Sequence, residues 1–268
     1  MRMDELRTRD AIAAELRALG LAAGDMVMVH AALRRVGPVL GGADMVIAAL
    51  CDATGPDGTL AAYADWEENY EDLLDEHGRV PMWWRAHVPP FDARWSRAVR
   101  HNGAFPELLR TTKDVVTSAN PGARIAAIGA RAAWLTADHP LDYGYGPGTP
   151  FAKLAQAGGK VLMLGAPLDT MTLIHHAEHL ADIPKRVLRK EVPFARDGGT
   201  EWRTIEEFDT ADPPEGFADD YFGTIVEAFL ATGQGARGAV GDAECVLVDA
   251  APMLAFAVDW IEANAPKA

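Results

Sequence analysis

MVMVH, residues 26–30, is a short apolar run between two stretches with helical spacing. Such a run is typical of a buried strand, because apolar side chains fall on both of its faces. Before it, residues 8–20 begin with threonine and end with glycine, as a capped helix does. After it come a helical stretch at 43–52, a Gly-Pro-Asp-Gly turn at 55–58 and a strand-like run at 59–63. This order of helices and strands indicates a sheet covered by helices.

Residues 65–101 interrupt this rhythm, because they are rich in acids, tryptophan and proline. Regular structure then resumes, with helices expected near 104–111, 170–182, 216–232 and 250–262, strands near 115–117, 125–128, 161–164 and 244–248, and a β-hairpin at 187–207. We therefore expect an α/β fold with a central mixed β-sheet, helices on both faces and a small insertion subdomain over one sheet edge. A chain of 268 residues fits one domain over 1–268 that carries this insertion.

Composition narrows the function classes. The net charge of −14 repels nucleic acid and anionic membranes. The apolar runs are too short to span a bilayer, and the first residues lack the apolar core of a secretory signal. Cys51 and Cys245 lie far apart, as reduced thiols of a cytosolic protein do. We expect a cytoplasmic protein, a monomer or homodimer, with no nucleic-acid or membrane partner.

The negative charge is concentrated in two segments. Residues 65–76 contain seven acids without a lysine or arginine, and residues 204–221 contain seven more, again without a base. Two solvated loops would explain this composition. A wall that attracts a polycationic small molecule would explain it equally well.

The segment LIHHAEH, residues 173–179, places three histidines and a glutamate within five residues after the strand-like run 161–164. One interpretation is a general base: His175 accepts a proton while a carboxylate fixes its tautomer. Glu207 and Asp209, two apart on an expected strand, share a face, so one could orient His175 and the other bind a cation. A second interpretation is zinc binding by the H-x-x-E-H spacing of His175, Glu178 and His179. Ordinary surface or core histidines are the third.

The segment HAALRRVG, residues 30–37, follows the first strand and carries two arginines in an otherwise acidic chain. Backbone N–H groups at a strand end, together with guanidinium groups, suit a pyrophosphate. Paired arginines are also common on protein surfaces. The sequence has no Walker A motif and no G-x-G-x-x-G that follows an expected strand, so a nucleotide would be held in another way.

Taken in order, these motifs resemble those of the aminoglycoside 3-N-acetyltransferases, an acetyl-CoA-dependent family distinct from the GNAT fold. The resemblance runs over nearly the whole chain. It is carried by GDMVMVHAAL (24–33), GPDGTL (55–60), PFD (90–92), SANP (118–121), GTP (148–150), LMLGAP (162–167), LIHHAE (173–178), ADIP (181–184) and EFD (207–209).

The resemblance implies transfer of acetyl from acetyl-CoA to the 3-amino group of an aminoglycoside, without a metal. His175 would be the catalytic base, held by Asp209 or Glu207. The implied cofactor contacts are His30, Ala31, Ala32, Leu33, Arg34, Arg35, Val36, Gly37, Ser118 and Thr172. The implied substrate contacts are Tyr63, Asp65, Glu67, Asp169, Glu178, Glu207 and Asp209.

The chain departs from the family pattern at three places. Ala31 and Ala32 stand where serine is frequent, Asn120 replaces a frequent histidine, and His176 stands where tyrosine or leucine is common. Three alternatives remain: an acetyltransferase for another amine on the same fold, a zinc hydrolase that uses the H-x-x-E-H segment, and a non-catalytic module that binds polycations.

Overall fold

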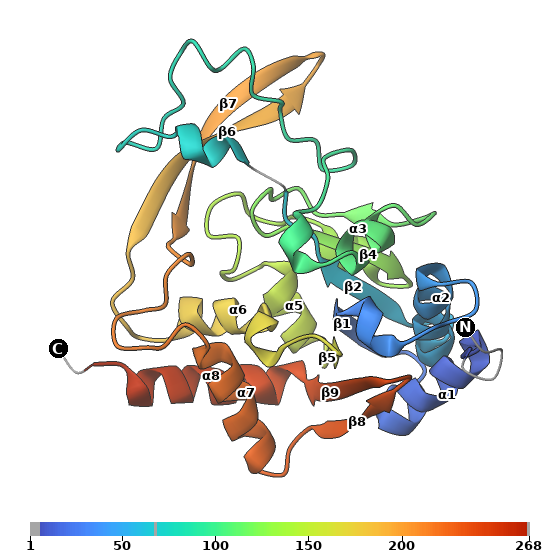
Figure 1. The fold of residues 1–268 in the computed structure, drawn as a ribbon. Helices are drawn as coiled ribbons and strands as arrows, with labels where there is room; N and C mark the ends of the chain where they lie inside the picture. Colours follow the sequence, from blue (N-terminus) through green and yellow to red (C-terminus); the bar gives the residue numbers. More distant parts are fainter. Residues whose placement is uncertain (1–5, 67–68, 267–268) are drawn as a thin grey trace.

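A computed structural model describes residues 6–66 and 69–266, and its centre is a seven-stranded sheet of order β3-β4-β2-β1-β5-β9-β8 (Figure 1). β1 pairs in parallel with β2 and β5, and the other pairs in this sheet are antiparallel, so the sheet is mixed as predicted. The strands are β1 (Met26–Ala31), β2 (Thr59–Tyr63), β3 (Val116–Thr117), β4 (Ile125–Gly129), β5 (Lys160–Leu164), β8 (Ala236–Val240) and β9 (Ala243–Asp249).

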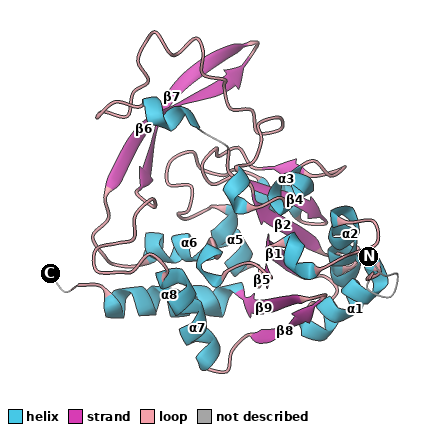
Figure 2. Cartoon of the chain, in the orientation of Figure 1, coloured by secondary structure: helices cyan, strands magenta, loops and turns pink. Residues whose placement is uncertain are grey.

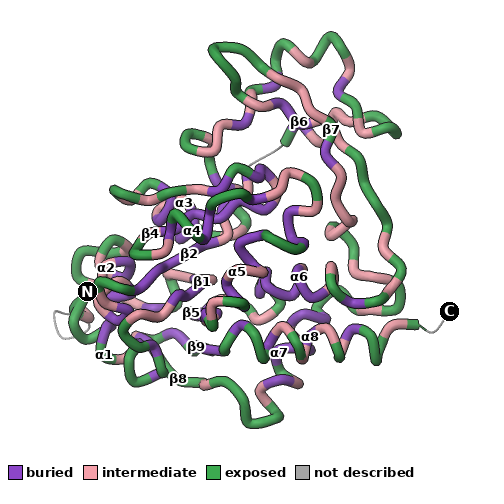
Figure 3. The backbone as a smooth tube through the Cα atoms, turned by 180° about the vertical axis from the view of Figure 1, so that it is seen from behind, coloured by how far each residue is buried: buried purple, intermediate pink, exposed green. Residues whose placement is uncertain are grey.

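Helices cover both faces of the sheet, which confirms the predicted α/β class. One face packs against α1 (Arg9–Leu19), α2 (Ala43–Thr54) and α3 (Phe105–Arg110). The other face packs against α4 (Ala132–Thr136), α5 (Pro150–Gln156), α6 (Leu173–Leu180), α7 (Tyr221–Ala231) and α8 (Ala250–Asn264). Figure 3 shows buried backbone concentrated along the sheet and its adjoining helices.

The sequence of β1 explains its central place. Met26 and Met28 enter the apolar cluster on the α6 side, whereas Val27 and Val29 enter the cluster on the α1 side. Side chains alternate across a strand, so a continuous apolar run requires cover on both faces.

The side-chain oxygen of Thr8 caps the preceding helix by accepting from the Ala11 N–H at 3.2 Å, as the sequence predicted.

The predicted hairpin forms a separate two-stranded sheet from β6 (Val187–Arg196) and β7 (Gly199–Phe208). Residues 69–101, mostly loop with short 3-10 turns at Asn69–Leu73 and Arg100–Asn102, pack along this hairpin (Figure 2). A small core joins the two parts: Trp66, Tyr70 and Phe91 meet hairpin side chains such as Val192 and Ile205. The other tryptophans of the segment, at positions 83, 84 and 95, are exposed.

A buried arginine ties this segment back to the main sheet. Arg124, at the start of β4, donates from Nε to the Ala64 carbonyl at 2.6 Å and from Nη1 to the Ser96 carbonyl at 2.9 Å. Burial lowers the pKa of its guanidinium to about 10. The hairpin and the segment beside it are therefore held at a fixed place relative to the sheet.

Within residues 6–66 and 69–266, the helices fall short of the length and apolarity needed to cross a membrane.

Candidate active site

The site lies where β1 and β5 end. Ala31 pairs with Leu164, so the chain leaves these two parallel strands at neighbouring points. Ligands of open α/β sheets bind outside the carboxyl ends of the strands. β1 continues into the turn Leu33–Val36, and β5 continues through Gly165 and the turn Leu168–Thr170 into α6.

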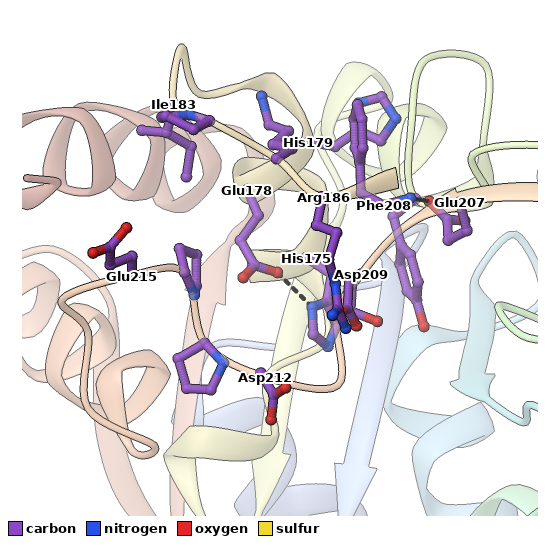
Figure 4. Close-up of a pocket in the computed structure, with 16 residues that line it drawn as sticks. His175, Glu178, His179, Ile183, Arg186, Glu207, Phe208, Asp209, Asp212 and Glu215 are labelled. Carbon is purple, nitrogen blue, oxygen red and sulfur yellow. Dashed lines mark hydrogen bonds and ion pairs between the residues drawn. The ribbon is translucent and has the colours of Figure 1, made fainter. Parts of the chain in front are cut away.

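α6 turns one face to the core and the other to a pocket. Leu173, Ile174 and Ala177 are buried against the sheet, while His175 and Glu178 remain partly accessible. The Nδ1 atom of His175 lies 2.6 Å from Oε2 of Glu178 (Figure 4). The spacing of three residues brings both side chains to one side of the helix.

A tyrosine from α7 completes this contact. The hydroxyl of Tyr221 donates to Oε1 of Glu178, and burial raises the pKa of the phenol, which keeps its proton in place as a donor. A carboxylate can only accept, so Nδ1 of His175 carries the hydrogen. The Nε2 lone pair of a neutral His175 is therefore left for another proton. The imidazole packs between the rings of Tyr145 and Phe222, with centroids 4.9 and 4.8 Å away.

His175 lines a pocket of about 410 Å³, which we call the acidic pocket. Its walls come from α6, the end of β7 and the segment that follows β7. The carboxylates that line it are Glu178, Glu207, Asp209, Asp212 and Glu215. Two cationic side chains, Lys185 and Arg186, also reach it, and Arg186 pairs with Asp209.

In the part of the chain that the structure describes, the hydrogen bonds of Glu207 and Asp209 go to groups other than His175. Glu207 accepts the backbone N–H groups of Gly144 and Phe208, and burial raises the pKa of its carboxyl to about 7. Asp209 lies beyond the end of β7, pairs with Arg186 and accepts from the Ala211 N–H at 3.0 Å. Glu178, which the family resemblance implies as a substrate contact, is the carboxylate that accepts from Nδ1 of His175.

The two neighbouring histidines have different surroundings. His176 is buried, and its Nδ1 donates to the Tyr145 carbonyl at 2.6 Å. His179 packs against the rings of Tyr143 and Phe208. Burial lowers the pKa of both imidazoles. Over the described ranges 6–66 and 69–266, no three His, Cys, Asp or Glu side chains are grouped so that they could hold a metal ion.

A second pocket of about 790 Å³, which we call the arginine pocket, opens at the end of β1. It is lined by Ala31, Ala32, Leu33, Arg34, Arg35, Arg97, Ala98, Arg100, Gly103, Ala104, Glu107 and Leu108. Five of the predicted cofactor residues thus share one cavity. Sequence reasoning missed Arg97 and Arg100, although residues 94–101 contain three arginines and a histidine. Arg35 donates to the Gly165 carbonyl at 2.9 Å, which fixes its side chain between the two strand ends.

The other predicted cofactor residues are not part of this lining. Val36 belongs to the core, and burial lowers the pKa of His30 to about 4. Gly37 has a φ of +82°, which suits glycine, at the end of the Leu33–Val36 turn. Ser118 and Thr172 are buried, and Ser118 contacts His139 and the Ile125 N–H.

Of the other predicted substrate residues, Tyr63, Asp65 and Asp169 are not part of the lining of the acidic pocket. The Tyr63 hydroxyl meets that of Tyr145 at 2.7 Å. Asp65 accepts from Asn102 at 2.5 Å, and burial raises the pKa of its carboxyl to about 7. Asp169 is exposed, and Glu67 lies outside the described residues. Among the first acidic run, Glu71 pairs with Lys190 on the hairpin. The acidic pocket therefore draws on the second run and on α6.

Comparison with known proteins identifies the family of this chain. The profile of the family described as aminoglycoside 3-N-acetyltransferase matches residues 28–262. The chain is 47% identical over 252 residues to aminoglycoside N(3)-acetyltransferase III of Pseudomonas aeruginosa. This alignment covers 92% of this chain and 91% of the relative. It is 43% identical over 268 residues to aminoglycoside N(3)-acetyltransferase VIII of Streptomyces fradiae, covering 96% and 92%.

Two solved structures resemble this chain over nearly its whole length. AAC-IIIb in a binary complex with CoASH superposes with a TM-score of 0.95 at 62% identity, covering 98% of this chain and 99% of that one. AAC-VIa bound to sisomicin superposes with a TM-score of 0.92 at 34% identity, covering 97% and 99%. The fold and the site thus define an α/β acyltransferase. The chain belongs to the aminoglycoside 3-N-acetyltransferase family.

Proposed function

We propose that this enzyme transfers acetyl from acetyl-CoA to the 3-amino group of an aminoglycoside by direct attack, with His175 as the base. The observation that carries the proposal is the chain of contacts from Tyr221 through Glu178 to His175 at the wall of the acidic pocket. It leaves Nε2 of a neutral imidazole as a proton acceptor beside a surface that attracts cations.

The base is needed because the acceptor amine is protonated near neutral pH and has no lone pair for attack. Nε2 of His175 removes one proton, directly or through water, and Glu178 stabilises the imidazolium that results. The amine nitrogen then bonds to the thioester carbonyl carbon and the C–S bond breaks. The second proton of the nitrogen passes to the leaving sulfur, and the imidazolium returns the first proton to solvent. The product is an amide, and no acyl-enzyme is formed.

Charge supports the placement of the two substrates. Five carboxylates line the acidic pocket, which suits a polycationic drug, and the relative AAC-VIa is bound to sisomicin. Four arginines line the arginine pocket, which suits the phosphates of a coenzyme, and the relative AAC-IIIb is bound to CoASH. The arginine pocket opens at the end of β1, and the acidic pocket is lined by α6, which follows β5, the parallel neighbour of β1. We place the meeting of thioester and amine between these two pockets.

A thiol-release assay with acetyl-CoA and a gentamicin-type aminoglycoside tests this function. We expect turnover by the wild type and a loss of roughly 10²-fold or more in His175→Ala. His77→Ala, at an exposed position on the hairpin side, is the matched control and should keep full turnover. Absence of thiol release by the wild type, or full turnover by His175→Ala, would contradict the proposal.

Two further arms of this assay address the alternatives. Replacing the drug by a linear polyamine such as spermidine tests whether another amine is the acceptor; thiol release with spermidine alone would favour that reading. Dialysis against a chelator tests the zinc hydrolase. The acetyltransferase should keep its full activity, whereas a zinc enzyme would lose it and regain it on addition of the metal.

A further inference from the structure

The loop of residues 143–146 contacts three parts of the site. The Gly144 N–H donates to the carboxylate of Glu207, the Tyr145 ring lies 4.9 Å from that of His175, and the Tyr145 carbonyl accepts from His176. Glu207 lies at the end of β7 and both histidines lie on α6. The loop therefore joins the two walls of the acidic pocket.

Two buried polar side chains hold this loop from behind. Nε2 of His139 lies 2.8 Å from the Gly144 carbonyl, and its Nδ1 lies 2.8 Å from Oγ of Ser118. Oγ of Ser118 also accepts from the Ile125 N–H of β4 at 2.9 Å. His139 and Ser118 are 6% and 1% exposed, so these contacts are shielded from water.

In each of these hydrogen bonds, the chemistry of the two partners determines which atom is the donor. A carbonyl only accepts, so Nε2 of His139 carries the hydrogen. Burial lowers the pKa of His139 to about 4, so the imidazole is neutral and its Nδ1 is an acceptor for the Ser118 hydroxyl. The donors therefore run one way, from Ile125 through Ser118 and His139 to Gly144. The N–H of Gly144 then donates to Glu207.

The loop 143–146 also packs directly against Asn120 on one side and His179 on the other. A Cβ atom on Gly144 would stand 2.6 Å from Nδ2 of Asn120, and one on Gly146 would stand 2.7 Å from Nε2 of His179. Asn120 itself donates to the Pro140 carbonyl at 2.8 Å and accepts from the Ala123 N–H at 2.8 Å. With this packing on both sides, a change behind the loop is transmitted to the pocket.

We propose that Ser118 and His139 are positioning residues for the acidic pocket, which set the Gly144 N–H against Glu207 and the Tyr145 ring against His175. This inference rests on the proposed function, because it concerns how that site holds the drug. It also gives Ser118 a different role from the cofactor contact that the family resemblance implied.

Two variants of His139 separate its two contacts. In His139→Asn the amide oxygen can replace Nδ1 as the acceptor for Ser118, but the donor to Gly144 is lost. In His139→Gln the amide nitrogen can replace Nε2 as the donor to Gly144, but the contact with Ser118 is weakened. We expect His139→Asn to raise the KM for the aminoglycoside roughly 10-fold and His139→Gln to stay near wild type. The KM for acetyl-CoA should be unchanged in both.

The pH profile gives a second readout. Loss of the hydrogen bond from His139 to the Gly144 carbonyl releases the Gly144 N–H from Glu207 and so destabilises the ionised form of that carboxyl. The acidic limb of kcat/KM for the drug should therefore move up by roughly one pH unit in His139→Asn. Ser118→Ala should show a smaller shift in the same direction. Thermal unfolding reports the folded fraction of each variant, and calorimetry measures drug binding without cosubstrate.

Three outcomes would overturn the proposal. The two residues would have a purely structural role if folded His139→Asn and Ser118→Ala kept the wild-type KM for the drug and the wild-type acidic limb of kcat/KM. Equal effects of His139→Asn and His139→Gln would show that the Gly144 contact is not what matters. A raised KM for acetyl-CoA in Ser118→Ala would return that residue to the cofactor site. Failure of the proposed function is recognised separately, because the wild type would then release no thiol.

Discussion

Glu178 contacts His175 from one turn further along α6, with Oε2 2.6 Å from Nδ1. Only 22% of the histidine side chain and 13% of the glutamate side chain are accessible, so solvent screens the contact weakly. Because both residues lie on the same short helix, folding of α6 alone sets their spacing. The second oxygen of Glu178 is engaged by Tyr221 of α7, which fixes the carboxylate from the other side.

The first prediction concerns this pair. Glu178→Gln keeps an oxygen that can accept from Nδ1 of His175 but removes the negative charge that stabilises the imidazolium. We expect kcat to fall roughly 10²-fold with little change in the KM for acetyl-CoA. Tyr221→Phe, which leaves the carboxylate charged, should cost less. The role of Glu178 as the partner of His175 would be contradicted if steady-state kinetics showed that Asp209→Asn lowers kcat as much as Glu178→Gln does.

The second prediction concerns the arginine pocket. Arg100→Ala removes a guanidinium from its lining, and we expect the KM for acetyl-CoA to rise roughly 10-fold with kcat for the drug retained. Arg94→Ala is the matched control, because Arg94 lies over the exposed Trp95 ring in the same segment. Equal KM values for the two variants would remove Arg100 from the cosubstrate site.

The third prediction follows from the carboxyl of Glu207, whose pKa burial raises from 4.5 to about 7. The folded protein then binds this proton more tightly than the unfolded chain. The associated stability is present in full below pH 4.5 and is lost as the pH rises through 7. Glu207→Gln lacks this titration. Urea unfolding of both proteins should therefore show the variant gaining stability relative to wild type between pH 4.5 and pH 8.

Comparing the two proteins at both pH values cancels the hydrogen bond that the glutamine loses at every pH, and the titration of all other groups. A stability difference that does not change between pH 4.5 and pH 8 would mean that Glu207 titrates with an ordinary pKa. The acidic pocket would then hold a carboxyl that ionises near 4.5 in both the folded and the unfolded protein.

The fourth prediction concerns salt. Because charge supplies much of the attraction for a polycation, the KM for the aminoglycoside should rise as ionic strength increases. Asp212→Asn removes one carboxylate from the acidic pocket and should flatten this dependence. Asp219→Asn removes an exposed carboxylate from the same acidic run, outside the pocket lining, and should leave the slope as in wild type. Identical slopes for the two variants would refute the role of the pocket charges.

Local patterns predicted the elements that have strong local signals. The Thr8 cap, the apolar run of β1 and the Asp197-Gly198 turn of the hairpin appear where their residues indicated. The strand Ala236–Val240 was not predicted, because it is an edge strand with mostly exposed side chains, a glycine and an arginine. The helix Ala132–Thr136 was not predicted either, since five residues are too few for a periodic pattern.

At the site, the sequence by itself indicated the histidine on α6 as a base and the arginines after β1 as cosubstrate contacts. The spacing of Glu178 brought it to the same helix face as His175, without indicating that it would hold the imidazole. Spacing along a helix or strand is a local property, so these could be read from the chain. Only the tertiary structure decided which partner each of them meets. Glu207 and Asp209 were plausible braces for His175, but β7 ends at Phe208, and their hydrogen bonds go to Gly144, Phe208, Arg186 and Ala211. Such choices depend on contacts between segments distant in sequence, where burial and competing donors determine the pairing.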